Sequence, residues 1–555
     1  MNETVTGKNF YEIDAPLREQ IARRVDPDLQ GWATDRLMKW GELCGGPVAE
    51  RAEIIDKNPP RLERYDRWGY EVNRVIHHPA AIATKRDLCE AGFTGFVWSD
   101  EARSDPKKRH AAGIMNQVFS YLLNQSDTGM ACACGMTGGV ARIVDLFASE
   151  EIKEEFLPRL ITTDYENLLD GSMFMTERSG GSDLSNTETT AIKDGQRWLL
   201  EGEKWFCSNV DGKAILTLAR PEGGGSGTKG LGLFLVPRQL DDGTTNTVHI
   251  RRIKDKLGTR SVPTGEVIFE RTVAYQLGEP GLGINRMMEM VNVSRLGVAV
   301  MGAGIARRTF LEAARYASER EAFGRTIRDY PMVRETLVDM QVESEAAMAM
   351  FLEASDTAGR IRDSEASDLQ AYVRILVPLT KIRAARTGLK NAVEAVEILG
   401  GNGYIEDWPT ARQLRDAQCH TIWEGTENIN SLDVLRAMVK GSAHEALLEK
   451  VDQVIDGSDP GLSSDLKEAR ADLPRWVEAV TSNHELHARR FANRLCDVIA
   501  GALLLESAPS SERAALVADH YLRKHLSDAD PLEAPQSSFD DANFSTIVDG
   551  ASNLN

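Results

Sequence analysis

The sequence predicts a mainly α-helical protein with a central β domain, and three observations lead to this expectation. Apolar residues recur at three- and four-residue spacing from about Asp26 to Leu160, as they do in amphipathic helices. Residues 172–271 change to short apolar runs separated by glycine-rich turns, a pattern typical of strands. After residues 278–283 the helical period returns and continues in long runs to about Lys440, which favours a helical bundle.

The expected strands and domains follow this change of period. Strands are expected at residues 197–202, 214–219, 231–236 and 266–270. A chain of 555 residues is too long for one hydrophobic core, so several domains are expected. They are an N-terminal helical domain with an extended arm (1–171), a β-barrel domain (172–280), a helical bundle (281–440) and an additional acidic helical segment (441–555). A polar tail after Asp530 is expected to be mobile.

Composition and charge favour a globular protein of a reducing compartment. Hydrophobic residues make up 42% of the chain and charged residues 27%, as in soluble proteins. No membrane span is expected, because the longest apolar stretches, such as 498–505, are far shorter than the roughly 20 residues required. Seven scattered cysteines do not form a disulfide framework, so a cytoplasmic location is expected. A net charge of −19 argues against nucleic acid or a membrane as a partner.

The turn Trp423-Glu424-Gly425-Thr426 places one carboxylate beside a large aromatic ring. Partial burial raises the pKa of a glutamate towards neutrality, which suits a general base that takes a weakly acidic proton. The alternative is an ordinary helix N-terminus, with Thr426 as the cap and a glutamate near the helix dipole. The turn alone favours the cap, and the other motifs of the chain change the balance.

Two motifs of the β region suit a ligand with a pyrophosphate and a planar ring. Residues 175–183 contain consecutive Gly and Ser, which let backbone N–H groups approach a phosphate closely. In residues 202–209, Phe206 could cover one face of a planar ring, and Ser208 could donate to a ring nitrogen. Each motif also has an ordinary interpretation, as a plain turn or as a strand with aromatic core residues.

The second helical region adds a phosphate-type arginine and a glycine pair. Arg320, in residues 318–325, is suited to holding a phosphate, and Gly400 and Gly401 let a backbone approach a flat adenine or a phosphate. The alternatives are a surface ion pair for the arginine and a helix C-cap for the glycines. All these motifs in one order, across a helical–β–helical frame, favour the functional interpretation.

These motifs resemble those of the flavin-dependent acyl-CoA dehydrogenases, and the similarity runs from about Thr137 to Val439. The shared motifs are residues 175–183, 204–209, 320–324, 398–404 and 423–429. The chain is most similar to the AidB-like subfamily, because of residues 58–66, 205–208 and 254–260 and the extended C-terminal helical segment. The resemblance implies an acyl-CoA dehydrogenase-like fold, with an N-terminal helical domain, a β-barrel domain and a C-terminal helical bundle. It implies FAD bound noncovalently between the β domain and the bundle, with a neighbouring subunit closing the site.

The resemblance also implies a role for each site residue. Glu424 would be the catalytic base, Phe206 would stand where the family usually has a shielding Trp, and Ser208 would stand near flavin N5. The cofactor-binding residues would be Thr176, Ser182, Phe206, Ser208, Arg320, Phe323, Gly400, Gly401, Thr426 and Asn428. The substrate-binding residues would be Ser294, Arg295, Trp423 and Gly425.

The implied reaction is the α,β-dehydrogenation of an acyl-CoA thioester. Glu424 would remove the α-proton, flavin N5 would accept the β-hydride, and an electron-transfer flavoprotein would receive the electrons. A homo-oligomer, dimer or tetramer, is implied by analogy. The acyl chain length stays open, because the bulky Trp423 would narrow the pocket whereas the small residues 131–135 would leave depth.

Two alternatives keep the fold and change the function. One is an AidB-like protein that binds and protects duplex DNA through its C-terminal segment. Residues 441–555 contain 10 Lys and Arg against 20 Asp and Glu, a net charge of −10 that would repel phosphates, although Arg489, Arg490 and Arg494 could form a local basic groove. The other alternative is a flavin oxidase or oxygenase, because the sequence does not reveal oxygen access.

Overall fold

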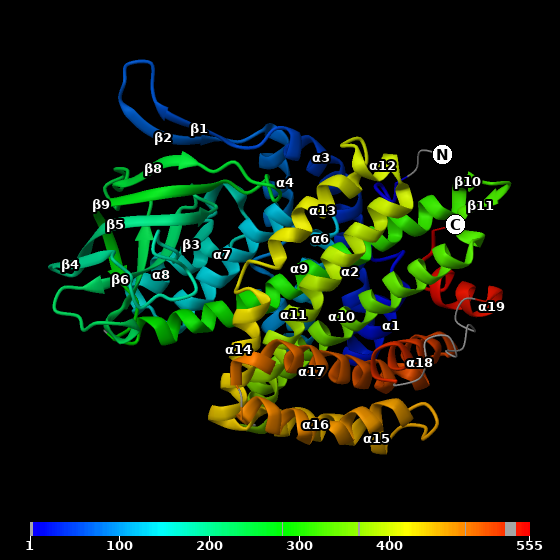
Figure 1. Cartoon of the computed structure of the whole chain (residues 1–555). Coiled ribbons are helices and arrows are strands. Elements are labelled where there is room, and N and C mark those ends of the chain that lie inside the picture. The colour runs from blue at the N-terminus through cyan, green and yellow to red at the C-terminus, as the bar shows by residue number, and fades with distance from the viewer. Residues whose placement is uncertain (1–3, 280, 364–366, 483, 528–539, 555) are drawn as a thin grey trace. The chain divides into compact units, whose positions relative to one another are not determined.

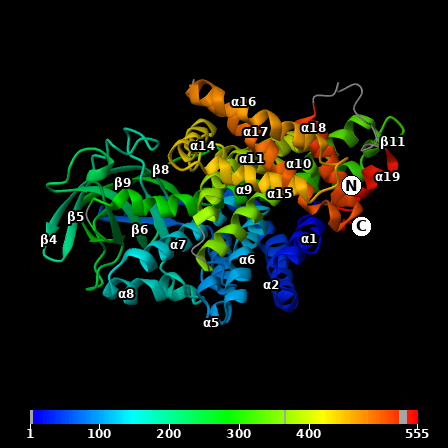
Figure 2. The ribbon, with the colours of Figure 1, turned by 90° about the horizontal axis from the view of Figure 1, so that it is seen from below.

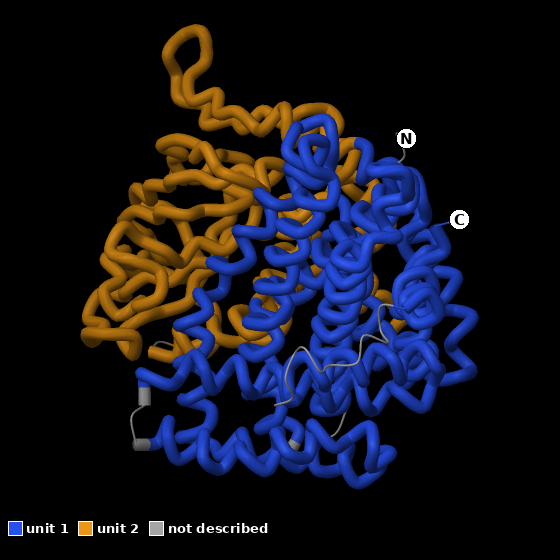
Figure 3. Tube along the Cα trace, turned by 45° about the vertical axis from the view of Figure 1, so that its right-hand side comes forward, with its two compact units in different colours: residues 1–50, 103–126, 295–555 blue, residues 51–102, 127–294 orange. Residues whose placement is uncertain are grey.

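The computed structural model describes residues 4–279, 281–363, 367–482, 484–527 and 540–554. Its helices and strands are labelled in Figure 1 and, turned by 90°, in Figure 2. The chain forms two compact units, coloured in Figure 3: unit 1 comprises residues 1–50, 103–126 and 295–555, and unit 2 comprises residues 51–102 and 127–294. Helices precede and follow a seven-stranded sheet along the sequence, so the predicted fold class is confirmed.

Unit 2 contains the seven-stranded sheet. Its strands are β3 (Gly171–Phe174), β4 (Thr190–Asp194), β5 (Arg197–Ser208), β6 (Ala214–Pro221), β7 (Gly232–Pro237), β8 (Val248–Ile253) and β9 (Thr264–Gln276). The order is β3-β5-β4-β6-β7-β9-β8, and β3 also pairs with β6 and β5 with β9, so the sheet folds back on itself as in a barrel. Strands β5, β6, β7 and β9 confirm the four predicted ones. The hydrophobic core enclosed by the sheet contains Phe174, Phe234 and Phe269.

Helix α7 (Thr128–Phe147) packs on β3 and on α8 (Glu150–Leu160) within unit 2. Its Val140 and Val144 share a core with Leu216 and Leu233 of the sheet. Among the described residues α7 is the one helix long and apolar enough to cross a membrane by length and composition, which differs from the expectation that every apolar stretch is far too short. Of its most apolar window 61% is buried, as in a core helix. The helices before α7 in this part of the chain are α3 (Ala49–Lys57), α4 (Pro79–Glu90) and α5 (Asp100–Arg103).

A β-hairpin interrupts the first region, which the sequence had predicted as mainly helical. Strands β1 (Arg61–Tyr65) and β2 (Glu71–Ile76) pair antiparallel, and Asp66 Oδ1 closes the turn by accepting from the backbone N–H groups of Trp68 and Tyr70 at 2.8 and 2.9 Å. Leu62 and Val75 lie opposite each other and pack against the core of the sheet. The region is mainly helical as predicted, but the hairpin is not predicted, because most of its other positions are charged or exposed and one apolar pair gives no period-two signal.

Unit 1 contains the long helices expected from the sequence. Helix α9 (Gly283–Glu319) crosses the unit boundary, and α10 (Pro331–Asp363) packs on α11 (Ser367–Leu399), as Figures 1 and 2 both show. The shorter helices of this unit are α1 (Ala15–Arg24), α2 (Gln30–Leu43), α6 (Pro106–Asn124), α12 (Gly401–Tyr404), α13 (Pro409–His420) and α14 (Glu427–Gly441). Helices α13 and α14 pack on α11, which places the connection between them against that helix.

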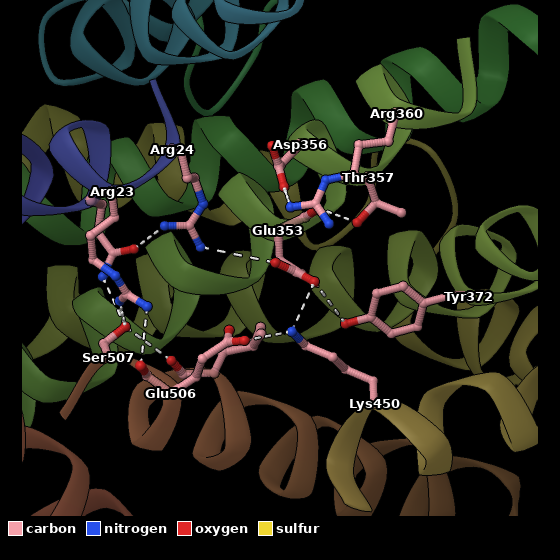
Figure 4. Close-up of polar contacts among 12 residues, drawn as sticks. Arg23, Arg24, Glu353, Asp356, Thr357, Arg360, Tyr372, Lys450, Glu506 and Ser507 are labelled. Carbon is pink, nitrogen blue, oxygen red and sulfur yellow. Dashed lines mark hydrogen bonds and ion pairs between the residues drawn. The ribbon is translucent and has the colours of Figure 1, made fainter. Parts of the chain in front are cut away.

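The additional C-terminal segment is helical, as predicted, and is fixed to the bundle by a half-buried polar network. Its helices are α15 (Ala443–Asp456), α16 (Ser464–Ser482), α17 (His484–Ser507) and α18 (Glu512–Leu526). Figure 4 shows Lys450 of α15 between Glu353 of α10 and Glu506 of α17, with N–O distances of 3.7 and 2.7 Å. Tyr372 and Arg24 approach the same Glu353 carboxylate, with 3.4 and 4.0 Å between the polar atoms.

The end of the chain differs from the mobile tail that the sequence predicted. Residues 528–539 lie outside the described part, but residues 540–554 form helix α19 (Asp541–Phe544) and a π-helical turn (Ser545–Asp549). Phe544, Ile547 and Val548 are buried, because apolar residues at this spacing form one face of a helical turn. Arg307 of α9 donates to the carbonyl of Ala551 at 2.7 Å. The expectation of a mobile tail is therefore wrong for residues 540–554.

Candidate functional site

The turn between α13 and α14 in unit 1 has an unusual backbone conformation. Glu424 and Gly425 both have positive φ, +55° and +93°, and a positive φ is uncommon for a residue with a side chain. Asn430 of α14 holds this conformation, because its Nδ2 donates to the carbonyls of Gly425 at 2.8 Å, Thr426 at 3.0 Å and Glu424 at 3.3 Å. The partly exposed Glu424 side chain therefore extends from a backbone that Asn430 holds in place.

Two cations complete the support of this turn. Lys381 of α11 donates to the carbonyl of Gly425 at 2.5 Å, and Arg295 of α9 donates from Nε to the carbonyl of Glu424 at 3.4 Å. Arg295 is 5% exposed and is itself held by Asp433 of α14, with 2.6 Å between Nη1 and Oδ2. Three helices thus converge on the carbonyl groups of the turn. This arrangement fixes the backbone that carries the Glu424 carboxylate, which suits a positioned general base.

Lys381 has the most informative electrostatics of the turn. Burial lowers its pKa, Arg295 lowers it further, and the attraction of Glu424 raises it, with a result of about 8. The lysine is therefore charged at neutral pH and loses its proton just above it. It was missed in the sequence, where it stands alone in the apolar run 375–382, although a single lysine in such a run is itself a signal.

His420, the last residue of α13, is fully buried, and neither ring nitrogen has a hydrogen-bond partner among the described residues. Burial and the charge of Lys381 lower the pKa of His420 to about 3. Below pH 6.5 the unfolded chain binds a proton at His420 that the folded chain does not bind. The free energy of unfolding therefore decreases as the pH is lowered. Between pH 6.5 and 5 we expect wild type to lose about 2 kcal/mol more than His420→Leu does.

Urea unfolding of both proteins at the two pH values measures this difference. His487→Leu, at a partly exposed position of α17, is the matched control and should follow wild type. Equal losses in wild type and His420→Leu would show that His420 does not titrate as its burial implies.

The predicted glycine pair lies at the end of α11. Gly400 has a φ of +61° and caps the helix, with its N–H donating to the carbonyl of Glu397 at 3.1 Å. The C-cap that was the alternative interpretation is therefore present. Added Cβ atoms at Gly400 and Gly401 would meet no atom within 4 Å, so the surface is open to a ligand here. A cofactor contact at these glycines stays a prediction.

Arg320 and Phe323 lie at a second exposed turn of unit 1. Residues 321–322 and 325–326 form the two-stranded hairpin β10 (Glu321–Ala322) and β11 (Arg325–Thr326), and the turn residues Phe323 and Gly324 have φ of +51° and +86°. These values fit a type I′ turn, in which a phenylalanine is a strained choice. The Phe323 side chain is 98% exposed, and Arg320 is exposed as well. A large ring held out on a strained turn is suited to contact with another molecule.

In unit 2 a buried ion pair anchors the Gly-Gly-Ser loop. Lys204 of β5 donates to Glu177 at 2.7 Å and to the carbonyl of Leu218 at 2.9 Å. Lys204 is 1% and Glu177 5% exposed. A Cβ added to Gly181 would lie 2.6 Å from Thr176 Oγ1, so a larger residue here would displace the Thr176 side chain. The ion pair holds the segment that carries Thr176 in place.

The other predicted residues of unit 2 present hydroxyl groups and a ring. Phe206 is 55% exposed on β5, and the amino group of Lys254 lies 4.9 Å from its ring centroid. Ser208 is partly buried, with its Oγ 3.0 Å from Thr264 Oγ1, and Ser182 is exposed. Ser294 hydrogen-bonds back to the carbonyl of Val291 at 3.1 Å.

The remaining predicted residues lie around the turn of unit 1. Thr426 is the N-cap of α14 and accepts from the N–H of Ile429 at 3.5 Å, so the helix-cap interpretation is also present. Trp423 is partly buried, whereas Asn428 is exposed. Among the described residues, no group of three or more His, Cys, Asp or Glu could hold a metal ion.

Unit 1 fixes the backbone of a glutamate on a turn of its helical bundle, and unit 2 exposes hydroxyl groups and an aromatic ring on a barrel-like sheet, features that fit the acyl-CoA dehydrogenase class of proteins. Three family models match the chain: the N-terminal domain of adaptive response protein AidB at residues 1–167, the acyl-CoA dehydrogenase middle domain at 172–272 and the acyl-CoA dehydrogenase C-terminal domain at 281–439. The chain belongs to the acyl-CoA dehydrogenase family, and its N-terminal region is of the AidB type.

Individual relatives agree with this assignment. The putative acyl-CoA dehydrogenase AidB of Escherichia coli is 31% identical over 466 residues, which cover 82% of each chain. The crystal structure of Caenorhabditis elegans ACDH-11 in complex with C11-CoA matches with a TM-score of 0.89 and 27% identity, over 96% of this chain and 93% of that one. The acyl-CoA dehydrogenase of Bacillus anthracis complexed with FAD shares the fold, with a TM-score of 0.71 and 19% identity over 96% and 94% of the two chains.

Proposed function

We propose that this protein is an FAD-dependent enzyme that introduces a double bond between Cα and Cβ of an acyl-CoA thioester. The observation that carries this proposal is the left-handed turn at Glu424, fixed through its carbonyl groups by Lys381, Arg295 and Asn430. Family membership supports the same reaction, since acyl-CoA dehydrogenase domains match residues 172–272 and 281–439.

The residues that we assign to FAD fit such a cofactor. The hydroxyl groups of Thr176, Ser182 and Ser208 can donate to a pyrophosphate and to ring nitrogens, and the half-exposed ring of Phe206 can cover one face of a flavin. The open backbone at Gly400 and Gly401 leaves room for a nucleotide. Arg320 and the protruding Phe323 reach the FAD of a partner subunit, which makes the enzyme a homo-oligomer. Thr426 and Asn428 complete the cofactor-binding set.

The chain's own residues perform the proton chemistry. Bound FAD supplies the acceptor for the β-hydride. Glu424 takes the α-proton, and its backbone N–H donates to the thioester oxygen, where negative charge develops. Arg295, in contact with Asp433, donates to the carbonyl of Glu424 and so holds the backbone of the base. Trp423 and Gly425 line the pocket for the acyl group beside the base. Ser294 is a further substrate-binding residue. The C11-CoA bound by ACDH-11 supports an acyl-CoA ligand.

The proposal also covers the electron acceptor, the cellular compartment and the functional division of the chain. An electron-transfer flavoprotein in the cytoplasm is the electron acceptor, and the chain divides functionally at residues 171, 280 and 440, close to the bounds of the matched family domains. The direct test is product analysis: incubation with saturated acyl-CoA and a dye acceptor should yield an acyl-CoA lighter by two hydrogens. A thioester of unchanged mass, with consumption of the dye, would contradict the reaction.

Lys381→Met is expected to slow flavin reduction by acyl-CoA about 10- to 100-fold, because the turn loses one carbonyl contact and the positive charge near Glu424. The pKa of about 8 adds a second expectation. In wild type the rate falls as pH rises through 8, where the lysine loses its charge, and the variant lacks this fall. Stopped-flow reduction across pH 6.5–9.5 measures both. Lys390→Met, at an exposed position of the same helix, should behave as wild type, and a wild-type rate in Lys381→Met would refute the role.

A further inference from the structure

The carboxylate of Glu427, the first residue of α14, is the meeting point of three helices of unit 1. Arg489 of α17 donates to Oε1 at 2.8 Å and to Oε2 at 2.9 Å, a bidentate contact. Asn493, one turn further along α17, donates to Oε1 at 2.9 Å. Arg386 of α11 donates to Oε2 at 2.7 Å. Glu427 is only 8% exposed, so these contacts hold a carboxylate that is largely removed from water.

The Glu427 carboxylate is ionised because of these neighbours. Burial alone would raise its pKa, but the hydrogen bonds from Asn493 and Arg489 and the charge of Arg386 hold the pKa below its ordinary value. Negative charge in the first turn also interacts favourably with the helix dipole of α14. A buried carboxylate that lost its cations would have to move or take up a proton.

Any movement of Glu427 would reach Glu424 through the backbone. Only two residues separate them, Gly425 and the N-cap Thr426. Lys381 and Asn430 hold the Gly425 carbonyl from the bundle side, whereas the contacts to Glu427 come mainly from α17. The turn is therefore held at both of its ends.

Helix α17 can hold Glu427 in place because the helix is itself fixed to the bundle. Figure 1 labels α17 below α14, and the two helices pack together. Cys496 donates to the carbonyl of Leu379 of α11 at 3.3 Å, and Asp497 pairs with Arg383 of the same helix. At its far end Glu506 joins the Lys450 network of Figure 4.

We infer that the additional C-terminal segment positions the catalytic turn, with Arg489 and Asn493 as positioning residues that hold Glu427 and thereby Glu424. This inference rests on the proposed function. It gives the segment a role other than DNA binding. Arg489 is committed to Glu427, and Arg494 donates to the carbonyl of His525 at 3.2 Å, so two of the three arginines of the suggested basic groove serve contacts within unit 1.

The test is the double variant Arg489→Ala/Asn493→Ala in the full-length FAD-loaded protein. We expect amide hydrogen exchange at residues 424–430 to rise at least about fivefold, because the turn opens more often. We expect kcat with acyl-CoA to fall about tenfold with KM within about twofold, because the base is misplaced while binding is kept. Arg490→Ala, the exposed neighbour on the same helix, should leave both unchanged.

A coupling experiment separates positioning from general loss of stability. In a Glu427→Gln background the double variant should lower kcat by less than about twofold more, because the partner of both side chains is already altered. Unchanged exchange, exchange raised evenly over the whole of unit 1, or raised exchange with unchanged kcat would each overturn the inference. If no acyl-CoA reduces the flavin of wild type, the proposed function fails. The hydrogen-exchange result then still shows, independently of activity, whether Arg489 and Asn493 hold the turn in place.

Discussion

Glu424→Gln is expected to retain FAD and to lose flavin reduction by acyl-CoA, with a rate lowered by about 10³-fold or more. An amide cannot take the α-proton, and a general base contributes typically about 10²- to 10⁴-fold. The turn is held through the carbonyls of Glu424 and Gly425, which the substitution leaves in place, so the fold and the cofactor site should persist. Anaerobic stopped-flow absorbance of the flavin measures the rate.

The matched control is Glu468→Gln, an exposed carboxylate of α16. It should reduce its flavin at the wild-type rate, and both variants should bind FAD in equal amount. Flavin reduction in Glu424→Gln at a rate within a few-fold of wild type would remove Glu424 from the role of base.

Lys204→Met is expected to lower the free energy of unfolding of unit 2 by about 3–5 kcal/mol, because it leaves Glu177 as a buried carboxylate without its cation. Glu177 also accepts from the backbone of Glu188 and Thr189, so the whole loop that carries Thr176 should loosen. Urea unfolding followed by circular dichroism measures the change, and FAD affinity should fall with it.

Two further variants give this prediction its controls. Adding Glu177→Gln should restore part of the stability, since no charge then remains unpaired. Lys193→Met, at an exposed position of β4, should change stability by about 0.5 kcal/mol or less. Loss of less than about 1 kcal/mol in Lys204→Met would show that the pair is not needed to hold the loop.

Much of the fold could be predicted because its periodic patterns are long. Strands β5, β6, β7 and β9 have apolar runs bounded by glycine, and helices α9, α10 and α11 span 37, 33 and 33 residues. The hairpin β1–β2 escaped prediction because only Leu62 and Val75 carry its packing. The ordered end of the chain escaped prediction because four buried apolar residues stand within a polar stretch, and tertiary contacts such as that of Arg307 decide its structure.

The candidate site divides in a similar way. Short motifs in one order indicated Glu424, Gly400 and Thr176, whose residue types match a flavin and a base. Lys381, Asn430 and Glu427 lie outside or at the edge of those motifs, and only the packing of α11, α14 and α17 brings them to the turn. Contacts between helices far apart in sequence depend on side-chain rotamers that no local pattern encodes. The interaction of Arg489 with Glu427, across 62 residues, is the clearest example.

Anaerobic titration of the FAD-loaded wild-type protein with saturated acyl-CoAs of increasing chain length tests the central claim most directly. The account predicts that at least one of them removes the visible absorbance of the oxidised flavin, because the α-proton and β-hydride leave together. The acyl-CoA that reduces the flavin fastest would also show whether Trp423, which narrows the pocket, or the small residues 131–135, which leave depth, determine the preferred chain length. Protein that holds FAD but keeps its full flavin absorbance with every acyl-CoA would contradict the account.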